Sequence, residues 1–142
     1  MWRDNYASIY NNYVVLGSKI KVTAVQNNSN TPCMIAVLGV DSTSVTASVT
    51  TAMEQNNSQW KMMPQSGGPV TIVEDFYEPM KIFGVSAEDD SAFQSNNGSN
   101  PAEIWYYAVF ADSLNSTSTT ITFMVEIDYT VKFTDVIHQA AN

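Results

Sequence analysis

The feature that most constrains the fold is a run of alternating side chains close to the C-terminus, at residues 121–133. Its odd positions are all apolar or aromatic, and its even positions are polar or charged except for Met124. A period of two kept over this length predicts one long β-strand with one face in a core and the other in water. Glu126, Asp128 and Lys132 are expected on the wet face. The side chains expected in the core are Ile121, Phe123, Val125, Ile127, Tyr129, Val131 and Phe133.

The composition is that of an all-β protein in a single domain, residues 1–142. Hydrophobic residues make up 44% and aromatic residues 11% of the chain, which is enough for a packed core. Ser, Thr, Asn and β-branched residues are frequent, whereas long helix-forming tracts are absent from the sequence. No apolar run approaches the length of a membrane span, and the first six residues lack the pattern of a signal peptide.

Other segments also predict strands, separated by long loops rich in turn residues. Residues 33–40 are apolar at every position, so we expect this strand to be covered on both faces. A short helix is expected between residues 41 and 59. Six or seven strands with long loops favour a jelly-roll sandwich of two antiparallel sheets. The further strand segments are expected at 12–26, 60–63, 70–76, 80–85 (a strand or a helical turn) and 103–111.

The charge excludes binding of nucleic acid through the overall field of the chain. Six Lys and Arg stand against fourteen Asp and Glu, a formal net charge of −8, and phosphate neutralisation requires clustered cations. Lys19 and Lys21 share one face of a predicted strand; they could contact nucleic acid or form only its wet face. The single cysteine, Cys33, excludes an intrachain disulfide and is expected to be buried.

Three blocks carry a resemblance to a known family. Residues 6–22 read YASIYNNYVVLGSKIKV and follow Trp2; residues 76–85 read FYEPMKIFGV; residues 100–107 read NPAEIWYY. In this order and spacing they resemble the capsid proteins of circovirus-like viruses with circular single-stranded DNA genomes. Related jelly-roll coats occur in tombusvirus-like RNA viruses. The resemblance implies a virion protein that self-assembles into a small icosahedral shell around a genome, with no enzymatic activity.

The chain departs from that family at its start. Such capsid proteins usually begin with an arginine-rich arm and an initial strand before the tryptophan, whereas the only arginine here is Arg3. The first strand of the jelly roll is therefore expected to be missing. The viral genome is expected to be contacted through an N-terminal arm that is not in this chain.

Residues suited to catalysis or metal binding are few. The only histidine, His138, lies in a tail-like stretch without a nucleophile motif nearby, so no catalytic residue is assigned. No cofactor motif occurs and zinc lacks ligands. The acidic cluster Glu88, Asp89 and Asp90 is compatible with calcium, and also with a plain solvated loop.

The aromatic residues are the candidates for a binding surface. Consecutive aromatics on one strand point to opposite faces, so some of them are expected to meet another subunit, where Trp and Tyr are favoured. The alternative is a binding module, namely a jelly-roll lectin or a trimeric receptor ligand. The candidate interface residues are Trp2, Tyr6, Tyr10, Trp105 and Tyr107.

Overall fold

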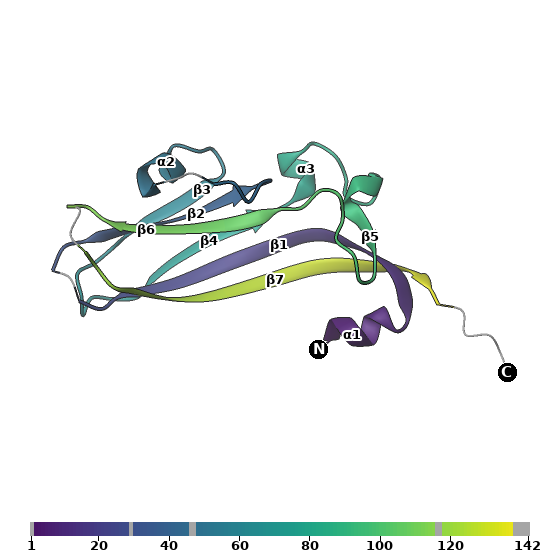
Figure 1. Cartoon of the computed structure of the whole chain (residues 1–142), viewed down its shortest axis with the longest axis horizontal. Coiled ribbons are helices and arrows are strands. Elements are labelled where there is room, and N and C mark those ends of the chain that lie inside the picture. The colour runs from purple at the N-terminus through teal and green to yellow at the C-terminus, as the bar shows by residue number, and fades with distance from the viewer. Residues whose placement is uncertain (1, 29, 46–47, 116–117, 138–142) are drawn as a thin grey trace. The chain divides into compact units, whose positions relative to one another are not determined.

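The computed structural model describes residues 2–28, 30–45, 48–115 and 118–137. Strands dominate it and the helices are short (Figure 1). Within these residues no helix is long and apolar enough to cross a bilayer. The elements are α1 (Trp2–Ala7), β1 (Tyr10–Gln26), β2 (Cys33–Val40), α2 (Val49–Met53), β3 (Ser58–Met63), β4 (Thr71–Tyr77), α3 (Pro79–Ile82), the 3₁₀ helix η1 (Ser91–Phe93), β5 (Gln94–Asn96), β6 (Tyr106–Ser113) and β7 (Ile121–Val136).

The strands form two antiparallel sheets. In the first sheet the order is β4-β1-β5, and β7 also pairs with β1. In the second sheet the order is β3-β2-β6, with Cys33 of β2 opposite both Met63 of β3 and Ser113 of β6. The all-β, two-sheet architecture expected from the sequence is therefore confirmed.

The chain divides into two compact units, which are described separately. The sandwich unit consists of residues 19–76 and 105–128. The terminal unit consists of residues 1–18, 77–104 and 129–142. The strands β1 and β7 contribute residues to both units. The expectation of a single jelly-roll domain over residues 1–142 stays a prediction.

The core of the sandwich unit lies between its two sheets. Alternate residues of β1, from Ile20 to Ala24, pack against alternate residues of β2, from Cys33 to Val37. Met63 of β3 and Val73 of β4 complete the buried cluster. Because successive side chains of a strand point to opposite faces, this spacing of two places one row from each strand inside. The prediction that Cys33 is a buried free thiol is confirmed.

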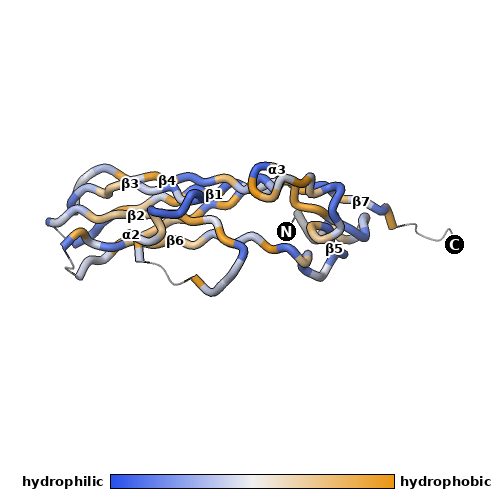
Figure 2. Tube along the Cα trace, turned by 90° about the horizontal axis from the view of Figure 1, so that it is seen from above, coloured by the Kyte–Doolittle hydropathy of each residue, from blue (hydrophilic) through white to orange (hydrophobic). Residues whose placement is uncertain are grey.

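The outer face of β2 is covered as well. Ala36 and Leu38 form a second buried cluster with Val49 and Ala52 of α2, and Figure 1 shows this helix beside β2 and β3. The short helix begins at Ser48, whose Oγ accepts a hydrogen bond from the backbone N–H of Thr51. In Figure 2 the segment labelled β2 is drawn mostly in apolar colours, in keeping with these two covered faces. The expectation of burial on both sides is confirmed.

The core expectation for β7 is wrong in the middle of the strand. Ile121 packs against the inner core, but Phe123, Val125 and Ile127 are 45%, 49% and 40% exposed. Tyr129 is also exposed, and Val131 and Phe133 are half-buried. The parity was right, because Glu126 pairs with Lys21 on the outer face of β1. Alternation places a side chain on a face, whereas burial requires another layer over that face.

The terminal unit has a smaller apolar cluster. Val14 of β1 is buried together with Ala87 and Phe93, and Leu16 packs against them. The ring of Phe83 lies 5.5 Å from that of Phe93, centroid to centroid. Residues 12–14 of β1 pair with β5, with Tyr13 opposite Ser95. This unit therefore packs a loop-rich segment onto the N-terminal half of β1.

Candidate assembly surface

The sandwich unit has one side that we call the open side: the outer edges of β6 and β7, with Phe123, Val125 and Ile127. In the second sheet β6 is the last strand, and among the described residues β7 pairs with β1 alone. Between β6 and β7 lies a hollow of about 650 Å³. Its lining consists of Val109, Ala111, Asp112, Ser118, Thr119, Ile121 and Phe123. The open side therefore combines strand edges with a hollow lined by apolar and polar side chains.

A second apolar hollow of the same unit lies between β3 and β4. It measures about 510 Å³. Met62, Val70 and Ile72 are exposed large apolar residues in its lining. Exposed apolar area of this kind is typical of surfaces that contact other proteins.

The predicted interface aromatics of the terminal unit gather around one ring. Tyr6 stacks on Phe133 with 4.9 Å between ring centroids, and Tyr10 lies 5.9 Å from the same ring. Tyr6 is 41% exposed, and Tyr10 is half-buried. Trp2 lies in α1, but its side chain is outside the described residues. A contact role for these residues stays a prediction.

The predicted interface aromatics of the sandwich unit serve internal packing in the isolated chain. Tyr107 of β6 packs against the inner core. The indole of Trp105 lies over Gly39, where an added Cβ would come within 2.4 Å of the ring. Glycine therefore admits the indole to this position. Both aromatics are half-buried, and their role at an interface stays a prediction.

The two lysines on the outer face of β1 are held by glutamates of the neighbouring strands. Lys19 Nζ lies 2.8 Å from Glu74 of β4, and Lys21 Nζ lies 3.0 Å from Glu126 of β7. Lys19 also lies over the ring of Phe76, 5.2 Å from its centroid. The hydrogen bond from Lys19 lowers the pKa of the Glu74 carboxyl. These ion pairs compete with phosphate for both cations.

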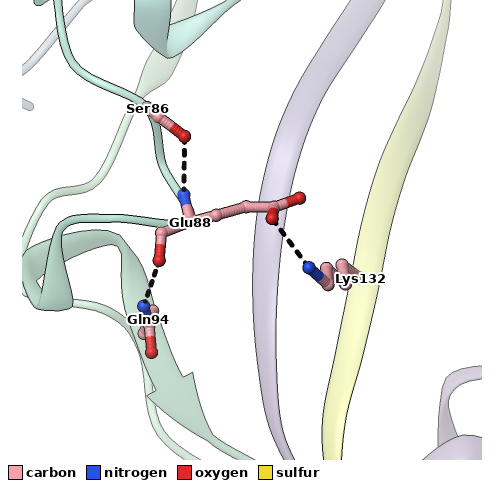
Figure 3. A network of polar contacts seen from close by, with 4 residues as sticks. All are labelled: Ser86, Glu88, Gln94 and Lys132. Carbon is pink, nitrogen blue, oxygen red and sulfur yellow. Dashed lines mark hydrogen bonds and ion pairs between the residues drawn. The ribbon is translucent and has the colours of Figure 1, made fainter.

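Two members of the acidic cluster, Glu88 and Asp90, are engaged within the terminal unit, and Figure 3 shows the contacts of Glu88. Glu88 Oε2 lies 2.7 Å from Lys132 Nζ, and the Glu88 backbone accepts a hydrogen bond from Gln94. Asp90 Oδ1 accepts from the Ala92 N–H at the start of η1. No group of three Cys, His, Asp or Glu side chains within the described ranges could hold a metal ion. His138 lies outside the described residues.

One carboxyl of the sandwich unit is perturbed by burial. Asp75 of β4 is half-buried, and desolvation raises the pKa of its side chain. A backbone hydrogen bond at Phe76 opposes this rise. A raised carboxyl pKa is useful in acid–base chemistry only beside a reacting group. The perturbed Asp75 therefore does not by itself define a catalytic site.

Comparison with known proteins identifies the fold. No protein-family model matches the sequence, and no curated protein matches it. Among solved structures, the coat protein of Desmodium yellow mottle tymovirus, a plant virus with single-stranded RNA, is similar to this chain. The match has a TM-score of 0.50 at 12% identity and covers 98% of this chain and 69% of that one.

The fold is therefore the jelly roll of viral coat proteins, which confirms the predicted fold class. Because the sequence identity is low, the structural match establishes the fold and nothing more. The match does not support the more specific resemblance to circovirus-like capsids, because the similar structure comes from an RNA virus.

The open side is the feature that sequence reasoning missed. The alternation in β7 was interpreted as burial, so its odd residues were assigned to the core and not to a surface. No signal in the sequence marked these odd positions as uncovered, because Met124, which interrupts the polar pattern, lies on the outer face of β7 with Glu126.

Proposed function

We propose that this chain is the structural domain of a viral coat protein, located in the virion, whose copies associate into an icosahedral shell. One observation carries the proposal: a viral coat fold is matched over 98% of the chain. Such a protein works by association, so no reaction and no catalytic residue is required. Its partner is a further copy of itself.

The surface supports association. Large apolar side chains are exposed on several elements of the sandwich unit, among them Trp60 on β3 and Phe76 on β4. Exposed aromatic residues are favoured at the centres of protein interfaces. Together with the stacked Tyr6 and Phe133 in the terminal unit, they give each unit its own apolar contact candidates.

We further propose a circovirus-like lineage with a single-stranded DNA genome. The support is the three sequence blocks at residues 6–22, 76–85 and 100–107. The genome would be contacted by an arginine-rich arm outside these residues. Inside them, Lys19, Lys21, Lys81 and Lys132 each lie within 3.0 Å of a glutamate oxygen.

The direct test of assembly uses the polypeptide expressed from the full reading frame that carries these residues. Analytical ultracentrifugation and negative-stain electron microscopy are expected to show closed particles. Raising the salt concentration should favour them, because copies with a net charge of −8 repel one another and salt screens this repulsion. A monomer at high concentration and high salt would contradict the proposal. Specific binding to a glycan array would favour the lectin alternative.

The proposal that the genome is contacted from outside these residues is tested with the 142-residue chain alone. Titration with single-stranded DNA at low and at physiological salt should show feeble binding, because few phosphates can be neutralised. Tight and steeply salt-dependent binding would mean that the domain itself holds the genome. The double variant Glu74→Gln and Glu126→Gln is the matched positive control, since it releases Lys19 and Lys21 from their ion pairs.

A further inference from the structure

The sandwich unit has fewer long strands than a jelly roll requires. A jelly roll consists of eight strands in two sheets. Here β4, β1 and β7 are the long strands of one sheet, and β3, β2 and β6 form the other. Counting long strands only, each sheet is therefore one short of four. The short strand β5 does not fill the place, because it pairs with residues 12–14 of β1 in the terminal unit.

Each sheet has one edge on the open side, at β6 and at β7, and its other edge at β3 or β4. All eight residues of β6 pair with β2 through one edge, from Cys33 opposite Ser113 to Val40 opposite Tyr106. No strand in the described part of the chain pairs with the other edge of β6, and β7 likewise pairs with β1 only. An edge strand of this length offers a row of backbone donors and acceptors to a further strand.

The side chains beside these edges are apolar where an added layer would cover them. Phe123, Val125 and Ile127 follow one another along the core-facing side of β7 at spacings of two residues. From β6, Val109 and Ala111 line the same hollow. A strand added at the edge of β6 would extend the facing sheet over this row, and a strand added next to β7 would place its own apolar side chains beside it.

We propose that the open side is completed by two further β-strands of the same polypeptide, outside these 142 residues. One would pair with the outer edge of β7 and the other with the outer edge of β6, giving four long strands in each sheet. The inference requires the jelly-roll fold and does not depend on shell assembly. It extends the expectation of one missing strand to two, each with a defined place.

Two observations favour this occupant over a second copy of the chain. The tymovirus coat protein that shares the fold is matched over only 69% of its length, so that coat contains further polypeptide without a counterpart here. A second copy would also bring another net charge of −8, and another Asp112, to the edge of the hollow. Strands within one polypeptide do not bring a second copy's charge of −8. They also lose no translational and rotational freedom of a separate molecule on pairing.

The test is the thiol reactivity of a reporter on β7. Val125→Cys is introduced into the 142-residue chain and into the product of the full reading frame, and both are labelled with Ellman's reagent. The native Cys33 is fully buried and gives a slow background. Phe76→Cys on β4 is the matched control, because Phe76 is exposed on the outer face of the same sheet. Ile127→Cys replaces the reporter if Val125→Cys does not fold.

The expected result is that the reporter reacts fast in the 142-residue chain and about tenfold or more slowly in the longer product, since labelling there requires local opening. This protection should be independent of protein concentration, and the control should react equally in both. Protection of the short chain that grows with its concentration would show a second copy as occupant and overturn the proposal. Equal reactivity in both products would overturn it too, as would a reading frame that contains only these residues.

Discussion

The strands β2 and β7 are both rich in apolar residues, yet their surroundings are opposite. In β2 the residues from Ile35 to Val37 are wholly buried, between the inner core on one face and α2 on the other. In β7 the residues Phe123, Val125 and Ile127 remain exposed although they face the core side. This difference shows that the burial of a strand is determined by the layers packed against it, and not by its own hydrophobic pattern. A covered strand stabilises the domain, whereas an uncovered one is available to a partner.

The largest effect should come from truncating the same residue type in the two strands. Ile35→Ala removes side-chain packing from the inner core and should lower the free energy of unfolding by about 2–5 kcal/mol. Ile127→Ala, at an exposed position of β7, should cost less than about 1 kcal/mol. Urea unfolding of the 142-residue chain compares them. Equal losses would mean that β7 is buried in solution and would break the comparison.

The next largest effect concerns the close approach of the Trp105 indole to Gly39 of β2. Gly39→Ala should destabilise the protein by about 1–3 kcal/mol, because the new methyl group would overlap the ring of Trp105. Tryptophan fluorescence should shift as the indole is displaced, and urea unfolding measures the loss. The control is the double variant Gly39→Ala with Trp105→Leu, in which the clash is removed. If the added methyl costs as much in that background, the indole is not the obstacle.

A smaller effect is expected from weakening α2, the helix that covers the outer face of β2. Ser48→Ala removes the cap of α2 and should cost about 1 kcal/mol in the free energy of unfolding. Thr43→Ala, at an exposed position before the helix, is the control and should be nearly neutral. Thermal unfolding followed by circular dichroism compares them. A neutral Ser48→Ala would show that the helix contributes little to covering β2.

The smallest effect concerns two adjacent carboxyls of β4. Burial raises the pKa of Asp75, so its stabilising contribution is present below its ordinary pKa and lost as pH rises through the raised value. Asp75→Asn should therefore be more stable than the parent at about pH 7 and similar at about pH 3.

The neighbouring Glu74 should behave in the opposite way. Lys19 lowers its pKa, so its contribution is present above the ordinary value and lost as pH falls. Glu74→Gln should be slightly less stable than the parent at neutral pH and equal to it in acid. Urea midpoints across pH measure both variants, and effects of the same sign would contradict the assigned causes.

Much of the fold could be predicted because its signals are local. The apolar run at residues 33–40, the turn-rich loops and the alternation in residues 19–24 and 121–133 each follow from the period of a strand. These signals predicted the strands, the burial of β2 on both of its faces, and the jelly-roll fold class. The candidate assembly surface was predicted less well, because Trp105 and Tyr107 pack within the sandwich unit. Whether they also contact another subunit depends on a neighbour that no local signal describes.

The sequence by itself determined most of the long strands, the parity of β7 and the acidic character that sets salt dependence. These are properties of single strands and of summed charge, which need no knowledge of neighbours. Only the tertiary structure decided that Lys19 and Lys21 are paired with glutamates from β4 and β7. It alone showed that no other described strand pairs with the outer edges of β6 and β7, and that an exposed row lies beside them. The physical reason is that pairing and burial arise between segments distant in sequence, where the order of strands in each sheet determines which side chains meet.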